Sequence, residues 1–230
     1  MNEDIQDRFK VLAEMTSTFS NQLLEAAKIL EQEAPGGFLE LSKYGWYLGF
    51  DSLPKTPVEL GRKLHSGKSV EVDEILKNYY EEELENIEWR LINRNPKRNE
   101  ILKEALKNHR EQNYCSAITV FLTQADGICY DRAKKLFFKN NGELRKKKVY
   151  RPEIEEELKN IFAKEFAVPL MQPTAINEHS DHTAKFPVKL NRHEILHGMD
   201  TSFGTKINSL KIISFLNYIN DIVEGSKNLD

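Results

Sequence analysis

The sequence of 230 residues is poor in the residues that interrupt helices or build disulfide frameworks. It contains 11 glycines, 8 prolines and 2 cysteines. Cys115 and Cys129 fall within one expected helical segment, too far apart along its axis for a mutual disulfide, and two cysteines are too few for a metal knuckle. We therefore expect two reduced core thiols.

Long apolar runs and an excess of one charge are also missing. No stretch approaches the roughly 18 apolar residues of a membrane-spanning helix, and residues 1–4 lack the basic and then apolar pattern of a signal peptide. The 33 Lys and Arg residues nearly balance the 36 Asp and Glu residues, for a net charge of −3. The chain as a whole thus has no general attraction for nucleic acid or membranes. We expect a cytoplasmic protein with no membrane partner, whose basic surfaces are local.

The first half of the chain shows apolar residues at helical spacing. Residues 4–33 predict one or two amphipathic helices that stop at Pro35-Gly36-Gly37, and an aromatic connector follows over 38–50. Thr56 as an N-cap and Pro57 at the first helical position predict a short helix that closes at Gly67. A longer helix is expected over 72–93.

The second half resumes after a break at Pro96. Helical periodicity runs from 98 to 140, residues 166–188 read as irregular, and two helices are expected over 191–197 and 205–223. No run of alternating polar and apolar residues predicts a strand. The sequence therefore predicts an all-α helical bundle, with an N-terminal helical region over 1–95 and a second domain over 96–230.

Charge is distributed unevenly along the chain. Acidic residues dominate 71–90 and 153–157, where solvated helix faces explain them. The segment 145–151 is basic, and it includes Lys146, Lys147 and Lys148. These lysines could contact phosphate groups, or they could pair with the neighbouring acids.

The segment from His193 to His197 matches the H-E-x-x-H zinc pattern. On a helix, this spacing places two imidazoles one turn apart, and Glu194 would act as the base for a metal-bound water. A catalytic zinc needs a third protein ligand, for which Glu224 is the candidate in the sequence that follows. This predicts the alternative of a zinc-dependent hydrolase that uses His193, His197 and Glu224.

The same residues also contain Arg192, four intervening residues and His197, with Asn191 before the arginine and the polar His193 after it. In a late position of an all-α chain, this arrangement resembles the signature of HEPN-superfamily ribonucleases, which include toxin, abortive-infection and CRISPR-associated enzymes. The resemblance covers residues 97–224. The first 95 residues have no counterpart in it.

The resemblance implies a metal-independent endoribonuclease without a cofactor. In such enzymes the RNA 2′-hydroxyl attacks the adjacent phosphate and leaves a cyclic phosphate and a 5′-hydroxyl. His197 would transfer the proton, Arg192 would hold the phosphate with its permanently charged fork, and Asn191 and His193 would support the site or bind RNA. Because five residues correspond to about 140° around a helix, Arg192 and His197 do not share one face. The family pairs two copies of the motif across a homodimer cleft, and its members imply a toxin or antiviral defence role.

Two other interpretations stay open beside these enzymes. The chain could be a non-catalytic HEPN-fold module that binds RNA or a protein, or the segment could be a polar helix start with surface histidines and a paired arginine. Asp126, next to Gly127 in the most apolar segment, is expected to pair with a cation of the motif region, and Gly127 to allow close packing. Gly198 is expected to end the motif helix in a left-handed conformation.

Overall fold

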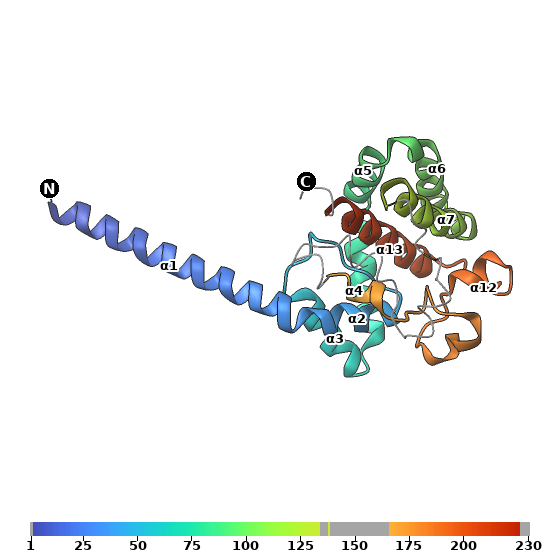
Figure 1. The fold of residues 1–230 in the computed structure, drawn as a ribbon, viewed down its shortest axis with the longest axis horizontal. Helices are drawn as coiled ribbons and strands as arrows, with labels where there is room; N and C mark the ends of the chain where they lie inside the picture. Colours follow the sequence, from blue (N-terminus) through green and yellow to red (C-terminus); the bar gives the residue numbers. More distant parts are fainter. Residues whose placement is uncertain (1, 134–137, 139–165, 226–230) are drawn as a thin grey trace.

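The structure is a computed structural model that describes residues 2–133, 138 and 166–225. In this part of the chain all regular elements are helices and no strand is present, so the predicted all-α fold is confirmed there. The elements, shown in Figure 1, are α1 (Asn2–Gln32), α2 (Ala34–Lys43), α3 (Thr56–His65), α4 (Ser69–Glu82), α5 (Leu84–Arg94), η1 (Pro96–Arg98), α6 (Asn99–Arg110), α7 (Tyr114–Ala133), α11 (Val168–Met171), η2 (Ser180–Lys185), α12 (Arg192–Leu196) and α13 (Lys206–Gly225).

Helix α13 lies at the centre of the body. It packs against α7, α4 and α5, while α6 packs against α7 and α5, and α2 packs against α3. Every residue from 209 to 222 is buried, so this stretch of the helix has no solvent-facing side. Its apolar side chains join one cluster with residues from α2 through α7. Residues on both sides of position 95 therefore contribute to the same core.

Buried polar groups on α13 have partners on other elements. Lys211 is 3% exposed, its ammonium lies 3.1 Å from the Asp73 carboxylate, and the Trp46 indole donates to that carboxylate at 2.7 Å. Burial lowers the pKa of Lys211, while the nearby Asp73 opposes that shift. Ser209 contacts His109 at 2.7 Å. These partners let a helix with polar residues occupy the core, because a buried polar group without a hydrogen bond is costly.

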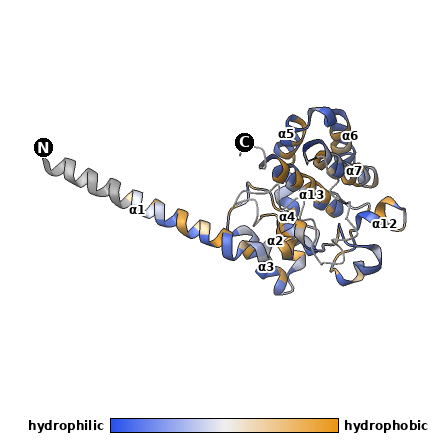
Figure 2. Cartoon of the chain, in the orientation of Figure 1, coloured by the Kyte–Doolittle hydropathy of each residue, from blue (hydrophilic) through white to orange (hydrophobic). Residues whose placement is uncertain are grey.

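Helix α1 contrasts with this body. It extends away from the other helices, and only its last turns adjoin them (Figure 1). Several stretches of its described ribbon are coloured orange in Figure 2, which marks hydrophobic residues. The prediction of a helix over 4–33 is confirmed by α1, which forms one continuous helix.

The first helix stops where expected, since α1 ends at Gln32, but Pro35-Gly36-Gly37 do not form a loop after it. These residues lie inside α2, with Pro35 in the first turn, where its missing N–H costs no hydrogen bond. A Cβ atom on Gly37 would overlap the carbonyl of Pro57 in α3, and a Cβ on Gly61 would lie 3.0 Å from Gly37 Cα. The glycines therefore serve close packing of α2 and α3. Residues 38–43 of the expected 38–50 connector consequently belong to α2.

Two of the longer predicted helices are each divided. The helix expected over 72–93 is α4 followed by α5, with a break at Glu83. In the one expected over 98–140, the described part is α6 followed by α7, with Gln112 between them at a positive φ of 64°. Residues 134–137, 139 and 140 of that segment lie outside the described residues. Thr56 lies inside α3 and Lys55 occupies the cap, one residue before the predicted position. The break at Pro96 is confirmed, and Gly67 follows α3 with φ 74°.

The two cysteines have different surroundings. Both lie on α7, but Cys115 is exposed and Cys129 is buried, so the prediction of two core thiols is wrong for Cys115. Among the described helices, none combines the length and the apolar character needed to cross a bilayer.

Candidate functional site

The motif residues lie on α12, a helix of five residues that Asn191 caps. The Asn191 side-chain oxygen accepts hydrogen bonds from the N–H groups of His193 (2.9 Å) and Glu194 (3.1 Å). Its amide nitrogen donates to the carbonyl oxygens of Ala175 (3.0 Å) and Glu178 (2.8 Å). Gly198 follows the helix with φ 71°, which confirms the expected left-handed end. Asn191 is 1% exposed and fully used in these bonds, so its side chain holds the site together rather than facing a ligand.

Arg192 is held by contacts from the region of α7. One terminal nitrogen lies 3.4 Å from an Asp126 carboxylate oxygen, and the guanidinium carbon lies 4.6 Å from the ring centre of Phe138. The expected pairing of Asp126 with a motif cation is thus confirmed. Arg192 Nε is buried and has no hydrogen-bond partner among the described residues. The guanidinium group is therefore held in place by two contacts, while its Nε–H remains a buried donor without a described partner.

Three imidazoles lie next to one another beside Arg192. The rings of His193 and His197 have centroids 4.3 Å apart, and the ring of His179 stacks on His193 at 5.8 Å with an interplanar angle of 24°. His182 follows, with its ring centre 6.4 Å from that of His179. His197 is exposed at the end of α12. We call His179, His182, His193 and His197 the histidine cluster.

The charges around the histidine cluster favour neutral imidazole at His193. Partial burial lowers the pKa of His193, and the neighbouring His197, His179 and Arg192 lower it further, while Glu194 opposes them. An imidazole of this kind is unprotonated at neutral pH and offers one nitrogen as a proton acceptor.

Sequence reasoning missed His179 and His182 as neighbours of the motif. They precede it by more than ten residues in a segment that reads as irregular. The Arg192 N–H donates to the Ile176 carbonyl at 3.1 Å, and together with the Asn191 amide this bond fastens the segment to α12. In the sequence, only Asn191 hinted at this contact, because its side-chain amide can bond backbone groups of a distant loop. The spacing of residues does not show which backbone groups it bonds.

The alternative zinc ligands are not gathered in one place. Glu194 accepts a hydrogen bond from the Thr183 hydroxyl at 2.8 Å, and Glu224 forms an ion pair with Arg132 of α7. In the described ranges, no group of three or more His, Cys, Asp or Glu side chains could hold a metal ion. His193 and His197 are neighbours, but the described part of the chain does not bring them a third ligand.

Positive charge near the motif is paired with acids. The ion pairs in this region are Lys185 with Glu178, Lys189 with Asp200, and Arg192 with Asp126. The predicted phosphate contacts Lys146, Lys147 and Lys148 lie outside the described residues. The described surface around α12 therefore has little net positive charge of its own.

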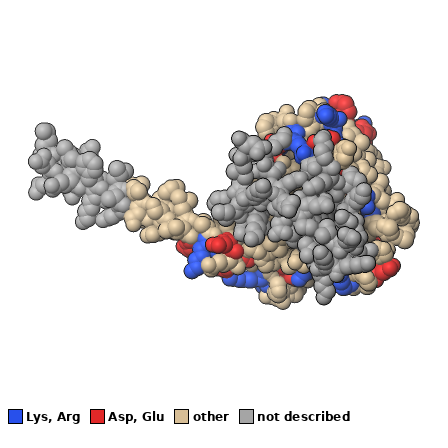
Figure 3. Space-filling view, viewed as in Figure 1, with Lys and Arg blue, Asp and Glu red and all other residues tan. Residues whose placement is uncertain are grey.

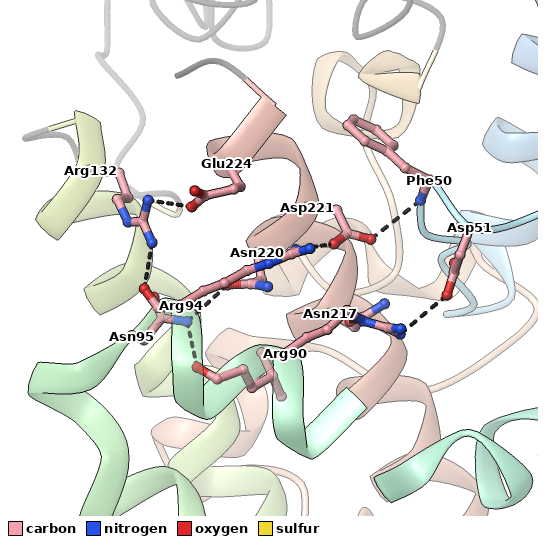
Figure 4. A network of polar contacts seen from close by, with 11 residues as sticks. Phe50, Asp51, Arg90, Arg94, Asn95, Arg132, Asn217, Asn220, Asp221 and Glu224 are labelled. Atoms are coloured by element: carbon pink, nitrogen blue, oxygen red, sulfur yellow. Dashed lines mark hydrogen bonds and ion pairs between the residues drawn. The ribbon is translucent and has the colours of Figure 1, made fainter. Parts of the chain in front are cut away.

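A second polar cluster surrounds the C-terminal half of α13, and Figure 4 shows it. Arg94 forms an ion pair with Asp221 at 2.7 Å, Arg90 pairs with Asp51 at 3.2 Å, and Arg132 pairs with Glu224. The three arginines thus face three acids. Because these charges balance and link α5, α7 and α13, the cluster explains how the helices are joined and leaves no surplus charge for an anionic ligand.

Comparison of the chain with protein-family models, curated proteins and solved structures gave no match. The function must therefore be argued from the residues of the site.

Proposed function

We propose that this chain is a metal-independent endoribonuclease of the HEPN type, with Arg192 and His197 as its catalytic residues. The observation that carries the proposal is the neighbourhood of α12. There, an anchored Arg192 and an exposed His197 lie at the two ends of the capped helix α12, beside two further imidazoles. Histidine can transfer protons at neutral pH and arginine can stabilise charge on a phosphate, so the two side chains can serve phosphate transfer without a metal.

In the proposed reaction, the 2′-oxygen of a ribose attacks the adjacent phosphorus, and the bond to the 5′-oxygen of the next nucleotide breaks. The products are a 2′,3′-cyclic phosphate and a 5′-hydroxyl. His197 transfers the proton that the 2′-hydroxyl loses or that the leaving oxygen gains. Arg192 stabilises the charge that develops on the phosphate oxygens through its guanidinium group, which Asp126 and Phe138 orient.

His193 supports this chemistry as a neutral imidazole. The lowered pKa of His193 keeps it unprotonated at pH 7, so it can accept a hydrogen bond from a ribose hydroxyl. Asp126 acts through Arg192, since its carboxylate orients the guanidinium without reaching the substrate in the proposal. Asn191 acts through the backbone of α12.

The proposed partner is RNA, and the proposed active form is a homodimer in which two motif copies line one cleft. A pair of α12 helices would double the imidazoles and guanidinium groups on a described surface with little net charge. The basic segment 145–151 would supply phosphate contacts. A toxin or antiviral defence role follows from the family alone.

The decisive experiment measures cleavage of single-stranded RNA in excess EDTA by the full-length wild-type protein and by Arg192→Ala and His197→Ala. We expect cyclic-phosphate products from wild type and a loss of at least about 100-fold in rate for each variant, as general acid–base groups usually contribute this much. Matched controls are Arg62→Ala and His65→Ala, since both residues are exposed on the distant α3. Thermal unfolding of every variant shows whether it remains folded.

The alternatives give different results in the same experiment. Glu194→Gln should retain cleavage, whereas a zinc hydrolase would lose it and would also contain one tightly bound zinc per chain. RNA that binds without being cut would establish a non-catalytic binding module instead. Cleavage that survives in both Arg192→Ala and His197→Ala would overturn the proposal.

A further inference from the structure

The four rings of the histidine cluster form a continuous row beside Arg192. The ring centre of His197 lies 4.3 Å from that of His193, which lies 5.8 Å from that of His179. The ring centre of His182 follows at 6.4 Å from that of His179. The two middle rings are half-buried, whereas His197 and His182 are exposed. His182 therefore ends the row on the side away from His197, with two imidazoles between them.

The segment that carries His179 and His182 is held in place by hydrogen bonds. The Thr183 hydroxyl donates to the Glu194 carboxylate of α12 at 2.8 Å, and the N–H of His182 donates to the His179 carbonyl at 2.9 Å. The Asn191 amide bonds the carbonyl directly before His179 at 2.8 Å. These bonds fix the backbone against α12, so the two imidazoles have defined positions beside the proposed catalytic residues.

The same segment contributes nothing to the hydrophobic core. No residue from 179 to 187 is buried, and none of the six residues of η2 joins the core cluster. Folding therefore does not require rings at positions 179 and 182. Side chains that bind ligands are often carried by surface loops that a rigid scaffold positions, and this segment has that form.

The charges around the two rings argue against binding through phosphate groups alone. Lys185 of this segment pairs with Glu178, and the exposed Asp181 carboxylate lies 3.3 Å from His179 Nδ1. On the face shown in Figure 3, the described surface around α12 is mostly tan, with separate blue and red groups. A surface with paired lysines and an exposed acid attracts the RNA backbone weakly. Binding of RNA at this end of the row must therefore come from the rings.

We propose that His182 and His179 form a nucleobase-binding subsite, in which an unpaired base near the scissile phosphate stacks on the exposed ring of His182. The inference rests on the proposed function, because Arg192 and His197 define which phosphate is cleaved. Every base has a π-face, so stacking on an aromatic ring tolerates any sequence. A base inside a duplex has both faces covered, whereas loops and single strands expose them. The subsite therefore selects single-stranded RNA over double-stranded RNA.

Stacking and phosphate contact make opposite demands on the side chain at position 182. A phosphate needs positive charge, which an imidazole carries only when it is protonated, while a base needs a flat ring. Phenylalanine keeps the ring and removes the charge. Lysine keeps a charge and removes the ring. His182→Phe and His182→Lys therefore separate the two modes of binding at one exposed position.

Binding of a single strand to the full-length protein at neutral pH tests the subsite. The probe is a fluorescent RNA of about 12 nucleotides with 2′-O-methyl groups throughout, which cannot be cleaved because no 2′-hydroxyl is free. We expect His182→Ala and His182→Lys to raise the Kd measured by anisotropy about 5- to 100-fold, the usual effect of losing one stacked base, and His182→Phe to leave it within about twofold. Retained binding in His182→Lys with a loss in His182→Phe would overturn the proposal in favour of a phosphate contact.

A probe without bases provides the second test. A strand of equal length with abasic sugars keeps every phosphate, so wild type should bind it more weakly than the complete strand, and His182→Ala should cause no further loss. Equal binding of both strands by wild type, or no binding of the complete strand, would overturn the subsite. His65→Ala is the matched control, since His65 is exposed on the distant α3, and it should bind as wild type does. Thermal unfolding shows that each variant is folded.

Binding and cleavage fail separately in this design. If His182→Ala binds the probe and cuts unmodified RNA as wild type does, the subsite is refuted and the proposed nuclease function stands. If His182→Ala loses base-dependent binding while wild type cuts no RNA, the subsite is supported and the proposed nuclease function is refuted.

Discussion

Helices α1 and α13 are both long and rich in apolar residues, yet their surroundings are opposite. Helix α13 has 20 residues and is buried on all sides over 209–222, whereas α1 has 31 residues and exposes large apolar side chains. The difference lies in their partners. Each buried polar group of α13 named above meets a group from another element. In α1, Leu30 near the end of the helix packs against the core, whereas Phe19 and Leu23 are exposed. The periodicity of apolar residues thus predicts a helix, but whether that helix is buried depends on which other elements of the chain pack against it.

The largest expected difference between the two helices comes from removing the same side chain in each. Leu216 of α13 is 0% exposed and Leu24 of α1 is 69% exposed. We expect Leu216→Ala to lower the free energy of unfolding by about 2–5 kcal/mol, because it leaves a cavity, and Leu24→Ala to change it by less than about 0.5 kcal/mol. Urea unfolding at low protein concentration, followed by tryptophan fluorescence, measures both, because Trp46 is buried in the folded state while Trp89 is exposed. Similar losses for the two variants would contradict the comparison.

The ion pairs of the two regions should also differ. Arg94→Gln leaves Asp221, whose side chain is 7% exposed, without its cation, and we expect a loss of about 3 kcal/mol at neutral pH. Lys55→Gln at the base of α1 breaks a pair with Glu25 whose side chains are both more than 60% exposed, and should cost less than about 0.5 kcal/mol.

The pH dependence of the Arg94→Gln effect has a defined sign. Burial raises the pKa of Asp221, and Arg94 opposes this, so the substitution raises the pKa further. A raised carboxyl pKa in the folded state favours folding at low pH and is unfavourable as pH rises through it. The loss should therefore be smaller at pH 5 than at pH 8. A larger loss at pH 5 would refute this reason.

A further pH-dependent effect, which vanishes at neutral pH, is expected from His109, which contacts Ser209 of α13. Burial lowers the pKa of His109 to about 4, so the unfolded chain takes up this proton near pH 6.5 and the folded chain only near pH 4. Stability should then fall by up to about 3 kcal/mol as pH decreases from 6.5 to 4. Comparison of denaturation midpoints for wild type and His109→Gln isolates this contribution. An unchanged slope in the variant would assign the pH dependence to other groups.

The sequence predicted the helical class and most helix locations because apolar spacing and few glycines and prolines act locally. It did not predict the breaks at Glu83 and Gln112, since neither residue is a glycine or a proline that would mark one. It misassigned Gly37 because that glycine accommodates Pro57, a contact between different helices.

At the candidate site too, features set by neighbouring residues were predictable, and features set by contacts between distant segments were not. The helix at Arg192 and the role of Gly198 were predictable from neighbouring residues, and the pairing of Asp126 followed from an acid placed in an apolar helix. The stacking of His179 on His193 was not predictable, because it depends on how an irregular segment folds back.

The four hydrogen bonds of Asn191 affect how substitutions in this region must be interpreted. A five-residue helix has no stability of its own in water. The positions of the α12 imidazoles therefore depend on the loop to which the Asn191 side chain is hydrogen-bonded. Replacing Asn191 would detach the helix and the loop from each other while leaving every arginine and histidine of the site in the chain. Such a variant would lose activity as if a catalytic residue had been removed, although it would have lost only the hydrogen bonds that align the reactive groups.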